Sequence, residues 1–191
     1  MPQFRLTKKY AADYRIGALL EPQNVLHPLD DWFIDVIRVK RKKIAMATHA
    51  QSVFTFFMPY AEVGGAASIP ECIGILLKEF LYDQDLSEWA EQIESLFRKP
   101  AIFCKTVDKK ILGHMNDFKR CVISYINYSP NGIDPINWDH LAKKVNSMPI
   151  NFSEENRYIY PVEMLGSLLG YPLKLLVRSY RLKLTLRWLY F

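Results

Sequence analysis

Three short segments rich in β-branched and aromatic residues follow one another closely, and they constrain the fold more than any other feature of the chain. They span residues 32–39, 43–48 and 52–58. Side chains of these types fit a pleated, half-buried surface, and the connections between the segments are short enough for hairpins. The pattern predicts an antiparallel β-meander, which Pro59 and the pair Gly64 and Gly65 would end.

The rest of the chain adds strand and helix patterns to this meander. Alternating apolar residues predict a short strand over residues 3–7, and an apolar run predicts another over 101–107. Capping residues and helical apolar spacing predict helices that start at Ser68, Asp85, Asn116, Asn137 and Pro161. We therefore expect an α+β fold in which an antiparallel β-meander and an added strand pack against about five helices, followed by a basic C-terminal β-strand.

Charge separates the end of the chain from the rest. Twenty basic and twenty acidic residues balance within 1–170, whereas 171–191 contains five basic residues and no acid. From Tyr180 to Trp188 apolar and polar residues alternate with a period of two, which predicts a strand. We expect an α+β domain over 1–170. The basic strand over 171–191 either pairs with that domain or begins a second domain that the chain truncates.

The predicted C-terminal strand would leave an unpaired edge, which proteins normally cover or charge. Its basic side chains Arg181, Lys183 and Arg187 flank Trp188, part of a terminal aromatic cluster. An edge of this kind is suited to strand addition by another chain. These four residues are therefore candidates for a partner surface, and a homodimer through the C-terminal strand is one expected assembly.

Composition excludes several classes of protein. Half of the residues are hydrophobic and 24% are charged, as in globular rather than disordered chains. No apolar run reaches the ~20 residues of a membrane span, and the first 20 residues lack a signal-peptide pattern. Cys72, Cys104 and Cys121 have no CxxC spacing, and the four histidines form no ligand pair. We expect a cytoplasmic protein with reduced thiols, no cofactor, no metal and no membrane partner.

A dense basic run lies in the first connection of the predicted meander. It contains Arg38, Lys40, Arg41, Lys42 and Lys43. Lysine and arginine side chains contact nucleic-acid phosphates with a salt-dependent affinity. The same residues also occur on solvated hairpins, where they prevent edge association. The run is the candidate nucleic-acid-binding site, and a solvated hairpin is the alternative interpretation.

A second candidate site precedes the helix predicted from Asn116. Gly113, His114, Asn116 and Asp117 would lie at a helix start, where free backbone N–H groups favour anions. The pattern is typical of an exposed recognition turn. Plain capping by Asn116, with Gly113 supplying an unusual backbone angle, is the competing interpretation.

Catalysis has weaker candidates. A metal-independent ribonuclease-like toxin needs a base, an acid and a positive group around a scissile phosphate. His49, His114 and Asp117, with Arg38 as the cation, supply these groups on paper. No spacing in the sequence brings them together. Cys104, in a predicted apolar strand, is interpreted as core rather than nucleophile, because a reactive thiolate needs positive, partly exposed surroundings.

An ordered set of motifs covers nearly the whole body of the chain. It consists of Thr-Lys-Lys at 7–9, Asp-Trp at 31–32, Leu-Gly-His-Met-Asn-Asp at 112–117 and Val-Asn-Ser-Met-Pro at 145–149. This order resembles a bacterial domain of unknown function. The resemblance carries no catalytic residue to any of these positions.

The C-terminal segment resembles a second family. Tyr-Arg-Leu-Lys-Leu-Thr-Leu at 180–186 is similar to the opening strand of the plasmid Ri open-reading-frame-three-like family, also labelled a transposon passenger. The two resemblances together imply a plasmid, phage or mobile-element context, including defence or counter-defence. We expect a non-catalytic interaction or nucleic-acid-associated module whose partner is nucleic acid or protein; the ribonuclease-like toxin is the alternative.

Overall fold

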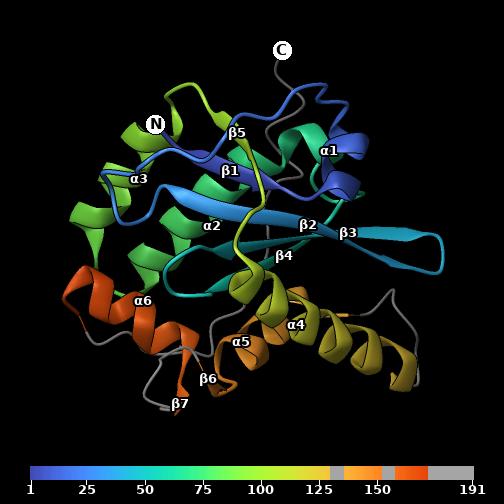
Figure 1. The fold of residues 1–191 in the computed structure, drawn as a ribbon. Helices are drawn as coiled ribbons and strands as arrows, with labels where there is room; N and C mark the ends of the chain where they lie inside the picture. Colours follow the sequence, from blue (N-terminus) through green and yellow to red (C-terminus); the bar gives the residue numbers. More distant parts are fainter. Residues whose placement is uncertain (130–135, 152–157, 172–191) are drawn as a thin grey trace, which may run out of the picture.

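A mixed five-stranded sheet forms the centre of the computed structural model, which describes residues 1–129, 136–151 and 158–171 (Figure 1). The strand order is β4-β3-β2-β1-β5. The strands are β1 (Gln3–Leu6), β2 (Asp31–Val39), β3 (Lys42–His49), β4 (Thr55–Pro59) and β5 (Ile102–Lys105). The antiparallel meander β2-β3-β4 is confirmed. β1 lies between β2 and β5 and runs parallel to both.

Six helices lie within the described residues and cover both faces of the sheet. They are α1 (Lys8–Tyr14), α2 (Ile69–Asp83), α3 (Ser87–Phe97), α4 (Lys109–Tyr128), α5 (Trp138–Asn146) and α6 (Pro161–Leu169). A 3-10 turn, η1 (Ala66–Ser68), precedes α2, and a small hairpin pairs β6 (Ile150–Asn151) with β7 (Tyr158–Ile159). The expected α+β architecture is confirmed.

Side-chain alternation along β2 divides the core into two parts. Trp32 and Ile34 face a cluster formed with α1, α2, α3 and α6. Phe33 and Ile37 face the opposite cluster, formed with α4 and α5. Because both faces are covered, β2 is a nearly continuous apolar run rather than a strict alternation.

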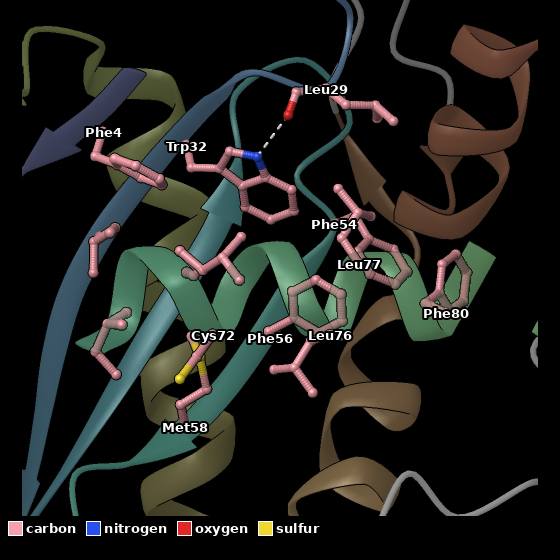
Figure 2. Close-up of a cluster of buried hydrophobic side chains, with 14 of the residues drawn as sticks. Phe4, Leu29, Trp32, Phe54, Phe56, Met58, Cys72, Leu76, Leu77 and Phe80 are labelled. Carbon is pink, nitrogen blue, oxygen red and sulfur yellow. Dashed lines mark hydrogen bonds between the residues drawn. The ribbon is translucent and has the colours of Figure 1, made fainter. Parts of the chain in front are cut away.

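Aromatic packing fills the larger of the two core clusters. Trp32 is fully buried, and its indole Nε1–H donates to the Leu29 carbonyl at 2.9 Å (Figure 2). Its ring stacks on Phe56 with 5.8 Å between centroids. Phe54 contacts Phe80 of α2 at 4.9 Å. The Phe54–Phe80 contact joins α2 to the residue before β4, and buried aromatic pairs of this kind contribute more than their area alone.

A missing side chain sets the approach of α2 to α3. A Cβ atom built on Gly74 of α2 would lie 2.7 Å from Cγ of Phe97 of α3, closer than real contacts allow. The Phe97 ring therefore occupies the space that any other residue at position 74 would need.

Three predicted helix starts can be compared directly with the structure. Asn137 caps α5 by accepting from the His140 N–H, as predicted. The predicted start at Asn116 is wrong: α4 begins at Lys109, because Asp108 Oδ1 accepts from the N–H groups of Lys110 and Ile111 at 2.8 and 3.1 Å. The predicted start at Ser68 is confirmed, since α2 begins at Ile69 with Ser68 in the N-cap position, but the Ser68 side chain makes no capping bond.

Two further features complete the comparison with the sequence. The unpredicted helix α1 follows β1 directly and is capped by Thr7, whose Oγ1 accepts from the Tyr10 N–H. Within the described ranges, no helix has the length and apolar character needed to cross a membrane. The predicted C-terminal strand, with Arg181, Lys183, Arg187 and Trp188, lies outside the described residues.

Candidate functional site

β1 pairs with only the first half of β2. The parallel register runs from Gln3 opposite Asp31 to Leu6 opposite Ile34, and the Thr7 N–H then donates to the Ile34 carbonyl at 3.0 Å. The chain next enters α1 and leaves the plane of the sheet. In the part of the chain that the structure describes, no strand pairs with residues 36–39 on this side. We call this stretch, residues 36–39 without a neighbouring strand on the β1 side, the β2 notch.

Asp35 terminates the β1–β2 pairing. Its Oδ1 accepts from the Thr7 hydroxyl and from the Val36 N–H, both at 2.7 Å. Its Oδ2 forms an ion pair with Nζ of Lys119 on α4. The Asp35 and Lys119 side chains are only 7% and 17% exposed, so the pair is largely removed from water. One carboxylate thus joins the end of β1, the middle of β2 and the second half of α4.

A surface groove of about 510 Å³ opens at the β2 notch. α1 forms one wall and α4 the other, and Figure 1 shows these helices on opposite sides of the β2–β3 hairpin. The lining residues are Lys9, Ala12, Val36, Ile37, Arg38, Lys119 and Ile123. Three of these side chains are basic, but Arg38 is paired with Asp13 and Lys119 with Asp35, so Lys9 makes the main contribution to any attraction of anions to the groove.

The predicted basic run forms the hairpin beside this groove. Lys40 and Arg41 make the turn between β2 and β3 and are exposed. Arg38 Nη2 and Lys43 Nζ instead bind Oδ1 of Asp13 on α1, at 3.0 and 2.9 Å. Arg38 and Lys43 therefore hold α1 against the hairpin, and part of their charge is neutralised.

The fold adds cations from two other elements to the predicted run. The combined set, which we call the basic surface, is Lys8, Lys9, Arg38, Lys40, Arg41, Lys42, Lys43 and Lys119. Sequence reasoning missed Lys8, Lys9 and Lys119, because their proximity depends on α1 and on the packing of α4. Asp13 and Asp35 offset two of the eight charges through ion pairs, and Glu62 interacts electrostatically with Lys42. Since residues 1–170 are neutral in total, the positive charge here is a local concentration.

The catalytic candidates lie on opposite faces of the sheet. His49 ends β3 and contacts the Trp32 ring at 5.1 Å, in the cluster covered by α2. Its Nε2 is 2.7 Å from the Pro28 carbonyl, and its Nδ1 is 2.8 Å from Oγ of Ser52. Burial lowers the pKa of His49 to about 4. The sheet separates this ring from His114 and Asp117, because α4 packs on the other face.

The predicted recognition turn is helical. Gly113, His114, Asn116 and Asp117 all lie inside α4, beyond its first turn, so the prediction of a turn at these positions is wrong. The physical reason is the cap at Asp108, which starts the helix earlier. Asp117 is exposed and accepts from Nη1 of Arg120 at 3.0 Å. Burial lowers the pKa of His114.

A buried polar network lies at the start of β1 and β2. Arg5 donates from Nε and Nη2 to the two carboxylate oxygens of Asp31, at 2.9 and 2.6 Å. Gln3 donates to Asp31 at 3.1 Å, and its Oε1 accepts from Cys104 at 3.3 Å. Burial raises the pKa of the Cys104 thiol, which opposes thiolate chemistry. Among the described residues, no group of three potential ligands gathers to hold a metal ion.

Comparison with known proteins adds a family to this description. The family model described as "Domain of unknown function (DUF6933)" matches residues 3–164. No curated protein and no solved structure matches the chain. The matched range includes the sheet, the β2 notch and the basic surface. The chain belongs to this family.

Proposed function

We propose that this member of the DUF6933 family is a non-catalytic module that associates with nucleic acid through its basic surface. The observation that carries the proposal is the row of exposed basic side chains on the β2–β3 hairpin, which Asp13 joins to α1 with its exposed Lys8 and Lys9. Lysine and arginine contacts to phosphates release counterions, which makes such binding sequence-tolerant and steeply dependent on salt.

The exposed part of the basic surface is its working part in this proposal. Lys40 and Arg41 lie at the hairpin turn, and Lys8 lies at the start of α1. These side chains project into water, whereas Arg38 and Lys43 are bound to Asp13. Phosphate contacts should therefore depend most on the turn.

We place the module in a plasmid, phage or mobile element. This context rests on the resemblance of residues 180–186 to the transposon-passenger family. The ribonuclease-like alternative gains no support from the positions of its candidate residues, because the sheet lies between His49 and the pair His114 and Asp117.

The experiment is fluorescence anisotropy with a labelled 20-base single strand and a 20-base-pair duplex of generic sequence. We expect binding at low salt that weakens steeply as salt is added. The double substitution Lys40→Ser and Arg41→Ser should reduce the affinity and lower the salt slope by about 2, since each phosphate contact contributes about one counterion.

A matched control separates local contacts from net charge. The substitutions Arg98→Ser and Lys99→Ser remove the same charge at the end of α3, where both side chains are exposed. They should leave the salt slope unchanged. Absence of binding at low salt, or an equal loss in both double variants, would refute the proposed nucleic-acid surface.

A further inference from the structure

Protein groups cover part of each outer edge of the sheet. At the β4 edge, Asn146 of α5 accepts from the Thr55 N–H at 2.8 Å and donates to the Thr55 carbonyl at 2.9 Å. At the β5 edge, the Leu20 N–H donates to the Phe103 carbonyl and the Lys105 N–H donates to the Leu20 carbonyl, both at 2.9 Å. Protein groups thus occupy backbone positions that could otherwise recruit another strand.

The β2 notch differs, because its backbone faces a groove. The Ala50 N–H donates to the Asp31 carbonyl, so the odd-numbered residues of β2 bond to β3. Alternation along the strand directs the even-numbered residues to the β1 side. Asp35 satisfies the Val36 N–H. The Val36 carbonyl and both backbone groups of Arg38 then face the notch, without a backbone partner among the described residues.

We propose that the β2 notch is a strand-addition site for an extended acidic peptide of a partner protein. The peptide would lie in the plane of the sheet, in line with β1, and bond to Val36 and Arg38. This inference goes beyond the proposed nucleic-acid binding, because it uses the β2 backbone and the apolar part of the groove lining; Lys9, Arg38 and Lys119 belong to both surfaces. Strand addition obtains affinity from main-chain bonds and specificity from side-chain contacts on the two faces.

Both walls of the groove carry a basic and an apolar side chain, but Lys119 on the α4 wall is already paired with Asp35. On the α1 side, the peptide would meet the ammonium group of Lys9 and the methyl group of Ala12. On the α4 side, it would meet Lys119 and Ile123. Successive side chains of a strand point to opposite faces. A segment with small apolar residues in the middle therefore matches both walls, and carboxylates at its ends match Lys9 and the exposed basic side chains of the hairpin.

The probe is an acetylated, amidated and fluorescein-labelled hexapeptide, Asp-Asp-Val-Val-Asp-Asp, which presents Asp, Val and Asp to each wall. We expect saturable binding by fluorescence anisotropy. The peptide Lys-Lys-Val-Val-Lys-Lys should not bind, because like charges repel. A version N-methylated at both valines keeps the charge but loses the one valine N–H that faces β2, and it should bind about fivefold more weakly or worse, since a lost bond costs about 1 kcal/mol.

Adjacent exposed residues supply matched variants. Lys9→Glu should weaken binding of the acidic hexapeptide about fivefold or more, whereas Lys8→Glu, outside the groove lining, should change it far less. On α4, Ile123→Glu should weaken binding and Ser124→Glu should not. All four positions are exposed, so circular dichroism should show an unchanged fold.

Amide exchange measured by NMR gives the decisive readout. Saturation with the acidic hexapeptide should slow exchange of the Arg38 amide. Equal binding of the N-methylated peptide, equal effects of Lys8→Glu and Lys9→Glu, or an Arg38 amide unchanged at saturation would overturn the proposal. Protection of this amide by an oligonucleotide and not by the peptide would also overturn it, and would assign the notch to nucleic acid. Loss of nucleic-acid binding in the Lys40 and Arg41 double variant, with peptide binding intact, would separate the two surfaces.

Discussion

The outer edges of the sheet and the β2 notch solve the same problem differently. At the β4 edge, the side-chain amide of Asn146 on α5 bonds to the strand backbone. At the β5 edge, the loop backbone at Leu20 does the same. At the notch, a four-residue strand lies beside a nine-residue strand, and Asp35 satisfies one amide where the shorter strand ends. The comparison shows that an opening inside a sheet arises from unequal strand lengths. Four measurements test how far the closed and open regions differ.

Removal of the carboxylate at the notch should have the largest effect. Asp35→Ala leaves the Lys119 ammonium and the Thr7 hydroxyl without their acceptor in a largely buried place. We expect the free energy of unfolding to fall by about 3 kcal/mol, measured by urea denaturation. Asp117→Ala breaks an exposed ion pair on the same helix and should cost less than about 1 kcal/mol. Equal costs would show that Asp35 does not join the elements around the notch.

Acid should lower the free energy of unfolding through His49, which is buried at the end of β3. Burial lowers its pKa from 6.5 to about 4, so the stability contribution is complete above pH 6.5 and is lost as the pH falls toward 4. The loss should be about 3 kcal/mol. Asp139, whose pKa burial raises to about 6, acts with the opposite sign in part of this window. The measurement is therefore the difference in urea stability between wild type and His49→Gln at pH 7, 5 and 4, and a constant difference would contradict the prediction.

Opening the β4 edge should have the next largest effect. Asn146→Ala removes both bonds to Thr55, whose backbone groups are then buried without partners. We expect a loss of about 2 kcal/mol in urea denaturation. The hydrogen-exchange rate of the Thr55 amide should also rise. If this rate stays at the wild-type value, the edge is closed by packing of α5 rather than by the Asn146 amide.

The smallest effect concerns the start of α4, which forms one wall of the notch. Asp108→Ala should cost about 1 kcal/mol, because the helix loses its N-cap acceptor. Asn116→Ala lies at an exposed position inside the helix and should be neutral or slightly stabilising. Thermal denaturation of the two variants ranks the caps. A larger loss of stability in Asn116→Ala than in Asp108→Ala would contradict the assignment of Asp108 as the N-cap of α4.

Much of the fold could be predicted because its elements have local signals. The meander follows from apolar segments that need only short connections, and Asn137 marks the start of α5 without reference to the rest of the chain. Helix α1 was not predicted, because its seven residues contribute only Tyr10 and Ala11 to the core. The early start of α4 was missed because Gly113 was interpreted as a turn residue, although helices tolerate single glycines.

The candidate site was predicted only in part, for a different physical reason. The basic run from Arg38 to Lys43 is contiguous and visible in the sequence. The groove depends on parallel pairing between β1 and β2, which are separated by a helix and a long loop, and on the contact of Lys119 with Asp35. No local pattern encodes pairing at that distance. The unequal lengths of β1 and β2, and the positions of α1 and α4 beside the groove, could therefore not be predicted from the sequence.

The close approach of α2 and α3 has a consequence for how this family varies. Because the Phe97 ring fills the space beside Gly74, the two positions share a single volume. A relative with alanine or serine at position 74 should carry a residue smaller than phenylalanine at position 97. A larger residue at position 74 should not be tolerated while phenylalanine stays at position 97. Substitution histories at these two positions are thus expected to be correlated, although the residues are far apart in the chain.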